Sequence, residues 1–268
     1  IPALVVTAPD TRKGRGMKLT PPPVKERIMN YELGIRNKIK ILQPEKLDSS
    51  FVSTLNTQRY TLFIVASYGK TLPKEILAIP ERGALNVHPS LLPLYRGPSP
   101  IESQTLDGAE TIGVTIMLMD EKIDHGRILA QQVLGFKMYD FPPEADPPSA
   151  ERFKDVHDRL AHLGGKLLAQ TIPDWAAGNI DAKEQDHAAA TYTKIVKKED
   201  GLMRLSDNPE LNYRKFLAYS DWPSAYFFQN GKRIKITDAE LKDGQFIIKK
   251  IISEGKKEIS YTDLKKHF

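Results

Sequence analysis

The chain has 268 residues, of which 40% are hydrophobic and 27% are charged, and this composition favours a globular protein with room for two domains. It has no cysteine, which excludes disulfides, thiolate metal sites and a cysteine nucleophile. No apolar run is long enough to cross a bilayer and nothing at the start resembles an export signal, so we expect a cytoplasmic protein.

The formal net charge of +5 is concentrated towards the C-terminal end. Residues 191–268 contain 16 Lys and Arg against 11 Asp and Glu, whereas residues 1–190 contain 23 of each. A basic module beside a neutral one suggests an anionic partner such as a nucleic acid. A lysine-rich solvated surface explains the same excess, so charge alone leaves the partner open.

The first 176 residues read as alternating strands and helices. Apolar, β-branched runs predict strands buried on both faces, as in a parallel sheet. These strands are expected at residues 3–7, 60–66, 84–88 and 113–118. Helices are expected at residues 24–33, after three prolines, and at residues 149–171, where apolar residues recur every three or four positions. The pattern predicts an α/β domain.

The remainder changes character. Residues 177–190 are polar and are interpreted as a linker. Residues 191–268 contain a predicted helix at 210–220 and short predicted strands at 225–229, 233–237 and 245–252, with tight turns at Asn230-Gly231 and Asp243-Gly244. Several short strands joined by tight turns predict a small β-barrel domain. Trp222 could serve as a base-stacking platform, but we favour a structural role because Trp222-Pro223 leads straight into the barrel.

The densest chemical signal is Asn86-Val87-His88, which the turn Ser90-Leu91-Leu92-Pro93 follows. Because Asn86 and His88 are two positions apart in a predicted strand, an amide and an imidazole share one face. They lie at the carboxyl end of the strand, where open α/β sheets bind ligands. The rigid turn can present backbone groups to a flat, polar ligand.

Asp124 lies in a turn after the strand at 113–118 and is a natural partner for His88. Such a pair can keep the imidazole protonated. Asn86 and a protonated His88 suit acyl transfer to an amine because they can stabilise a tetrahedral oxyanion, while Asp124, directly or through water, helps to remove the proton from the amine. Taken singly, His88 and Asp124 are more often capping or turn residues, but their coincidence with the other motifs favours a site.

These motifs, together with Tyr95-Arg96-Gly97, Gly113-Val114-Thr115 and residues 120–126, resemble the folate-dependent formyltransferases, and the similarity spans nearly the whole chain. The resemblance implies a Rossmann-like open, mostly parallel sheet followed by a small OB-like barrel. It implies 10-formyltetrahydrofolate as a consumed cosubstrate, without a metal. The implied catalytic residues are Asn86, His88 and Asp124, and the implied folate-binding residues are Ser90, Leu91, Leu92 and Pro93.

A second motif distinguishes members of this family. Residues 9–25 resemble the loop that wedges into tRNA in the members that formylate methionyl-tRNA. The loop has four cations, Arg12, Lys13, Arg15 and Lys18, and flanking glycines that let it stay mobile until an acceptor stem orders it. The start of residues 191–268 resembles the tRNA-binding barrel of the same members. The implied partner is initiator methionyl-tRNA, formylated on the methionyl amino group for translation initiation by a monomer.

Two alternatives stay open from the sequence. A sugar-amine formyltransferase has the same core, although the basic loop and basic tail disfavour it. An RNA-binding protein without catalysis is the other, although the intact trio disfavours it. The first strand, phosphate-type turn and first helix of the family have no counterpart before Ile1. We therefore expect a catalytic domain at 1–176 that is incomplete at its N-terminus, a linker at 177–190 and a shortened barrel at 191–268.

Overall fold

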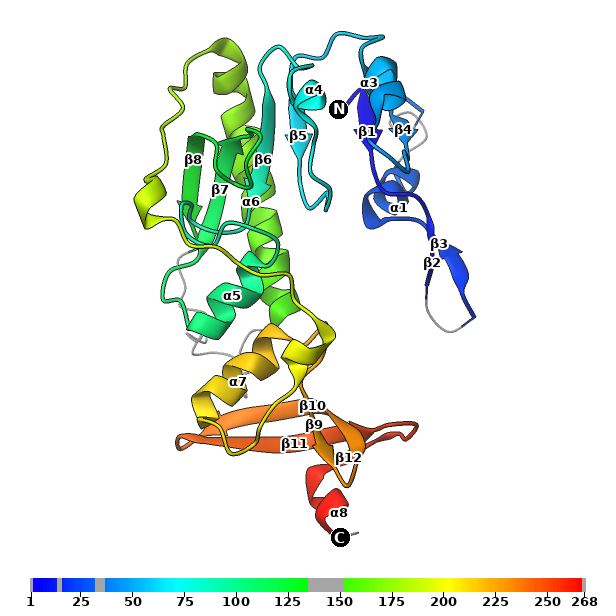
Figure 1. Ribbon diagram of the computed structural model, residues 1–268, viewed down its shortest axis with the longest axis vertical. Coiled ribbons are helices and arrows are strands. Elements are labelled where there is room, and N and C mark those ends of the chain that lie inside the picture. Colours follow the sequence, from blue (N-terminus) through cyan, green and yellow to red (C-terminus); the bar gives the residue numbers. More distant parts are fainter. Residues whose placement is uncertain (1, 14–15, 32–36, 135–151, 267–268) are drawn as a thin grey trace. The chain divides into compact units, whose positions relative to one another are not determined.

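The computed structural model describes residues 2–13, 16–31, 37–134 and 152–266 (Figure 1). The chain divides into two compact units, Ile1–Ala84 and Leu85–Phe268. Within the described ranges, no helix is both long and apolar enough to span a membrane.

The first unit is built around a pair of parallel strands. β1 (Leu4–Val6) lies beside β4 (Lys40–Leu42), with Leu4 opposite Lys40. Among its described residues, the helices are α1 (Pro23–Met29), α3 (Ser49–Leu55) and α4 (Lys74–Leu77), and β5 is Phe63–Val65. Phe51, Leu55 and Ile76 form its core. The predicted strands at 3–7 and 60–66 and the helix after the three prolines are therefore confirmed, each over a shorter span.

The second unit begins with an α/β layer. β6 (Ala84–His88) pairs antiparallel with β7 (Gly113–Leu118), and β7 pairs antiparallel with β8 (Ile128–Val133). The loop from β7 to β8 is too short for the crossover that parallel neighbours would need. Helix α6 (Phe153–Ala177) packs on β7 and β8, as Figure 1 shows, and α5 (Pro100–Asp107) packs against α6. The core residues are Ile101, Ile112, Val114, Val156 and Leu160.

The Rossmann-like α/β class is confirmed. The predicted strands at 84–88 and 113–118 are correct to the residue. The long helix continues through Pro173 to Ala177, six residues beyond its predicted end, and residues 149–151 of its predicted start lie outside the described ranges. Three of the paired strands run antiparallel, which apolar strand sequences alone did not indicate.

The chain ends in an antiparallel sheet. The segment before it contains the short helices η1 (His187–Ala189) and η2 (Lys198–Gly201), then α7 (Pro209–Ala218). The sheet has the order β12 (Glu258–Ser260), β11 (Gln245–Ser253), β10 (Lys232–Lys242), β9 (Tyr226–Gln229), and α8 is Tyr261–Lys266. It is open rather than a closed barrel, which is compatible with an OB-like domain.

Two predictions about this sheet have different outcomes. Asn230 and Gly231 have φ of 49° and 73°, and Asp243 and Gly244 have 50° and 71°, so both predicted tight turns are present. Trp222, for which the sequence favours a structural role, is 55% exposed, so its ring is not packed in the core.

Two adjacent glycines in α6 provide a test of the packing behind the site. A Cβ at Gly164 would lie 2.7 Å from Cγ1 of Val87, in the strand that carries Asn86 and His88, whereas a Cβ at Gly165 would meet nothing within 4 Å. We expect Gly164→Ala to lower the free energy of unfolding by about 1–3 kcal/mol through overpacking. Gly165→Ala should raise it by about 0.5–1 kcal/mol through helix propensity. Urea unfolding of both variants measures the two changes, and equal changes in the free energy of unfolding would contradict the prediction.

Candidate active site

The structure brings Asn86, His88 and Asp124 together. Asn86 and His88 lie on β6, and Asp124 lies in the loop between β7 and β8. Asn86 Nδ2 donates to Asp124 Oδ1 at 3.2 Å, and His88 Nδ1 lies 3.6 Å from Asp124 Oδ2. An amide, an imidazole and a carboxylate thus meet at the carboxyl end of a strand, as the sequence predicts.

The carboxylate of Asp124 is the most constrained group of the three. Oδ2 accepts a hydrogen bond from the backbone N–H of Gly97 at 2.7 Å, in addition to the bond from Asn86 to Oδ1. The side chain is 14% exposed, so it can still be reached from solvent. Its backbone has φ of 46°, in the left-handed region that few non-glycine residues adopt. The sequence placed Asp124 beside His88 but gave no indication of the Gly97 N–H.

His88 is buried, with 4% of its side chain exposed. Its Nε2 lies 2.9 Å from the carbonyl oxygen of Tyr95, and because a carbonyl can only accept, Nε2 carries a proton. Burial lowers the pKa of His88, against the opposing effects of the Asp124 carboxylate and the Tyr95 carbonyl. With the proton on Nε2, the ring presents Nδ1 to Asp124. Burial works against the expected protonated imidazole, whereas the Asp124 carboxylate favours it.

The turn after His88 is held mainly by hydrogen bonds that its backbone carbonyl groups accept. Thr115 Oγ1 donates to the Ser90 carbonyl at 2.7 Å and accepts from Leu92 N–H at 3.1 Å, and Gln131 Nε2 donates to the Leu92 carbonyl at 2.8 Å. The carbonyls of Leu91 and Pro93 accept further backbone bonds. Ser90 and Leu92 are buried, whereas Leu91 and Pro93 are partly exposed. These bonds make the turn rigid, as expected, but its carbonyl groups already accept hydrogen bonds from within the protein.

The loop that carries Asp124 is held by hydrogen bonds between its own residues. Asp120 accepts from His125 Nδ1 at 2.7 Å and from the backbone N–H of Lys122 at 2.9 Å. A Cβ at Gly126 would lie 1.9 Å from the carbonyl oxygen of Leu118, so only glycine fits there. The Asp-x-Gly spacing of the sequence therefore has a packing origin: Gly126 lets the loop close tightly after Asp124.

The basic loop of the first unit forms a hairpin. β2 (Thr11–Lys13) pairs antiparallel with β3 (Lys18–Thr20). Lys25 Nζ lies 2.9 Å from both carboxylate oxygens of Asp10, and this ion pair anchors the base of the hairpin. Arg12 and Lys18 are exposed, the backbone of Lys13 belongs to β2, and Arg15 lies outside the described residues. Exposed cations on an anchored hairpin suit contact with phosphates.

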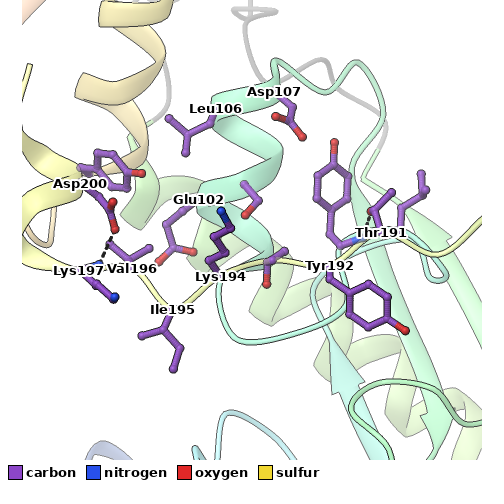
Figure 2. A pocket seen from close by; sticks show the side chains of 15 residues that line it. Glu102, Leu106, Asp107, Thr191, Tyr192, Lys194, Ile195, Val196, Lys197 and Asp200 are labelled. Carbon is purple, nitrogen blue, oxygen red and sulfur yellow. Dashed lines mark hydrogen bonds between the residues drawn. The ribbon is translucent and has the colours of Figure 1, made fainter. Parts of the chain in front are cut away.

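A cleft of about 730 Å³ lies between α5 and residues 191–197 (Figure 2). Tyr95 lines it with its side chain, while its carbonyl oxygen holds His88. Burial raises the pKa of Glu102, and burial with the charges of Asp200 and Glu102 raises the pKa of Tyr219 to about 12. Asn86, His88 and Asp124 do not line this cleft. Within the described residues, no cluster of three His, Asp or Glu could hold a metal ion.

Comparisons with known proteins agree on one family. The model of the formyl transferase family matches residues 2–141, and that of the formyl transferase C-terminal domain matches residues 195–260. A methionyl-tRNA formyltransferase of Chloroflexus aurantiacus is 44% identical over 236 residues, which are 88% of this chain and 71% of that protein.

Two solved structures share the fold. The methionyl-tRNA formyltransferase of Clostridium thermocellum has a TM-score of 0.61 at 18% identity, over 93% of this chain and 97% of that one. HypX of Aquifex aeolicus in complex with tetrahydrofolic acid has a TM-score of 0.67 at 14% identity, over 98% of this chain and 46% of that one.

The state of His88 predicts a pH dependence of stability. Because burial lowers its pKa in the folded protein below the ordinary value of 6.5, the unfolded chain binds the proton first as the pH falls. The free energy of unfolding is therefore highest above pH 6.5, where His88 is neutral in both states, and it falls as the pH drops below 6.5. We expect His88→Gln to lose less free energy of unfolding than the parent between about pH 7.5 and 5.5, measured by urea unfolding. His162→Gln, on the exposed face of α6, is the matched control. Equal losses in the parent and His88→Gln would contradict the prediction.

Proposed function

The chain belongs to the formyl transferase family, and we propose that it transfers the formyl group of 10-formyltetrahydrofolate to the methionyl amino group of initiator methionyl-tRNA, as methionyl-tRNA formyltransferases do. The observation that carries this proposal is the Asn86–His88–Asp124 geometry, in a chain that is 44% identical to a methionyl-tRNA formyltransferase. The formylated product then serves translation initiation.

The first step joins the amine to the formyl carbon. The methionyl nitrogen attacks that carbon, a C–N bond forms, and the formyl oxygen becomes an oxyanion. The Asn86 amide N–H₂ donates to this oxyanion as the charge develops, and so does the imidazole once it gains a proton on Nδ1. No covalent intermediate with the enzyme is needed.

The second step moves one proton. The attacking nitrogen becomes an ammonium, and its proton passes to the Asp124 carboxylate or to the neutral Nδ1 of His88, which lies 3.6 Å from Oδ2. The C–N bond to the folate nitrogen then breaks, and that nitrogen takes up the proton. The Tyr95 carbonyl keeps a proton on Nε2 throughout, so Nδ1 is the ring atom that exchanges the proton.

The two substrates use different parts of the chain. Ser90, Leu91, Leu92 and Pro93 border the folate, with Leu91 and Pro93 supplying accessible surface and the buried Ser90 and Leu92 fixing the turn. Arg12, Lys13, Arg15 and Lys18 contact the acceptor stem, and the basic C-terminal domain contacts the rest of the tRNA. The enzyme acts as a monomer in the cytoplasm. The catalytic domain is residues 1–176, and the tRNA-binding domain is residues 191–268.

The experiment that tests this function supplies the 268-residue chain with 10-formyltetrahydrofolate and one of two acceptors. Formylation of initiator methionyl-tRNA, followed by acid gel separation of the product, is the expected result. Formylation of an amino-sugar nucleotide instead would replace the proposal with a sugar N-formyltransferase. Binding of initiator tRNA without formylation of either acceptor would indicate an RNA-binding protein.

We expect His88→Ala and Asp124→Ala to lower the formylation rate by about 10²- to 10⁴-fold, because each removes a group that handles the proton or the oxyanion. Binding of initiator tRNA, measured by filter retention, should change little, since neither side chain is needed to hold the nucleic acid. Asp181→Ala, at an exposed position, is the matched control. A substantial residual rate in either variant would remove that residue from the mechanism.

We expect Arg15→Ala to raise the KM for initiator methionyl-tRNA several-fold and to leave the KM for folate nearly unchanged, because a loop cation neutralises tRNA phosphate. This expectation rests on the sequence of the loop, since Arg15 lies outside the described residues. Steady-state kinetics with each substrate varied in turn provides the measurement, and Arg59→Ala, an exposed cation outside the loop, is the control. Equal increases in both constants would contradict the assignment of the loop.

A further inference from the structure

Arg96 is a buried cation with neutral partners. The residue is 1% exposed, and among the described residues no carboxylate lies within 4.0 Å of its guanidinium. Nε and Nη2 both donate to Gln185 Oε1, at 3.1 and 2.6 Å. Nη1 donates to the Tyr192 hydroxyl at 3.1 Å, and Nη2 donates to His187 Nδ1 at 2.9 Å. Burying a charge this way is costly, so the arrangement calls for a functional reason.

Gln185 transmits the orientation of Arg96 to the loop that carries Asp124. Because a guanidinium can only donate, Arg96 fixes the oxygen of the Gln185 amide on its own side. The amide nitrogen consequently points the other way, and donates to the carbonyl oxygens of Asp124 at 3.0 Å and Gly126 at 2.6 Å. Gln185 is 5% exposed, and both ends of its amide are used.

The bond to the Asp124 carbonyl acts on a strained residue. Asp124 has φ of 46°, a conformation that costs free energy unless its surroundings hold it. Gly97, which follows Arg96 in the chain, donates its N–H to the carboxylate of the same residue. Residues 96 and 97 therefore hold both ends of Asp124: the carboxylate directly, and the backbone through Gln185.

The segment predicted as a linker is docked along this loop. Lys183 and Ile128 exchange two backbone hydrogen bonds, of 2.7 and 2.8 Å. The rings of His187 and His125 stack with centroids 4.0 Å apart and planes 6° apart. Farther along, Arg96 N–H donates to the Thr191 carbonyl at 2.9 Å, and Thr193 N–H donates to the Arg96 carbonyl at 2.7 Å. A freely moving connection would make none of these contacts.

We propose that Gln185 and Arg96 are positioning residues that hold the backbone of Asp124 in its left-handed conformation, and that residues 183–193 are thereby part of the active site. The inference rests on the proposed function in one respect: it takes Asp124 as a reacting group. The proposal explains why a cation is buried without a carboxylate partner. A carboxylate at position 185 would satisfy Arg96 but could not donate to the two carbonyls.

That difference supplies the test. Gln185→Glu keeps an acceptor for Arg96 and adds an ion pair, but it replaces the two N–H donors with oxygen lone pairs. Gln185→Ala removes both functions, and Gln58→Ala, at an exposed position, is the control. We expect kcat for formylation to fall by about 10- to 100-fold in Gln185→Glu and Gln185→Ala, with both KM values within about threefold of the parent. Rates are expressed per folded molecule, from the near-ultraviolet circular dichroism of each sample.

A role in stability alone would give another pattern. It would leave Gln185→Glu with the parent kcat, because the buried cation keeps its partner, and that result would overturn the proposal. A higher KM for tRNA in Gln185→Glu, with kcat equal to that of the parent, would also overturn the proposal. It would place Gln185 in tRNA binding instead.

A second measurement does not depend on activity. The negative charge of Asp124 raises the pKa of His88, so a displaced Asp124 should lower the NMR titration midpoint of His88 in Gln185→Ala relative to the parent. An unchanged midpoint would overturn the positioning role. If the parent itself transfers no formyl group, the proposed function fails while this titration still decides whether Gln185 positions Asp124.

Discussion

The hydrogen bonds to Asp124 are the constraint on which the candidate site depends. The carboxylate accepts from the side chain of Asn86 and from the backbone of Gly97, and it faces a buried imidazole. Without these donors, a carboxylate on a short loop would turn towards water. With them, it stays beside His88 at the carboxyl end of β6, where one proton can be held between two groups. Neighbouring segments of the second unit keep that arrangement in place.

Three sets of contacts hold Asn86, His88 and Asp124 in place. β6 and β7 pair through their backbones, and Gly164 of α6 lets the helix approach Val87 closely. The turn after His88 is fastened by Thr115 and Gln131. Its Tyr95 carbonyl fixes the tautomer of the imidazole. These groups are neutral hydrogen-bonding partners in a buried setting, where such bonds are strong and an unpaired group is costly.

The sequence was sufficient to predict several of the strands and the proximity of Asn86, His88 and Asp124, but not the contacts that support them. Asn86 and His88 were found because a period of two places them on one face of a strand, and Asp124 because it follows the next strand. Gln185 was missed because it lies 61 positions from Asp124 in a polar segment that reads as a linker. Burial lowers the pKa of His88 against the effect of the nearby carboxylate, and burial depends on tertiary packing that no local pattern encodes. The antiparallel direction of β6, β7 and β8 likewise has no signal in the composition of the strands.

The most direct test of the account is a crystal structure of the chain with a folate analogue whose formyl group cannot transfer. The formyl carbon is expected to lie against Asn86, His88 and Asp124, with its oxygen in hydrogen-bonding distance of Asn86 Nδ2 or the His88 ring, and with Leu91 and Pro93 beside the folate ring. A folate bound elsewhere, with Asn86, His88 and Asp124 in contact only with each other, would contradict it.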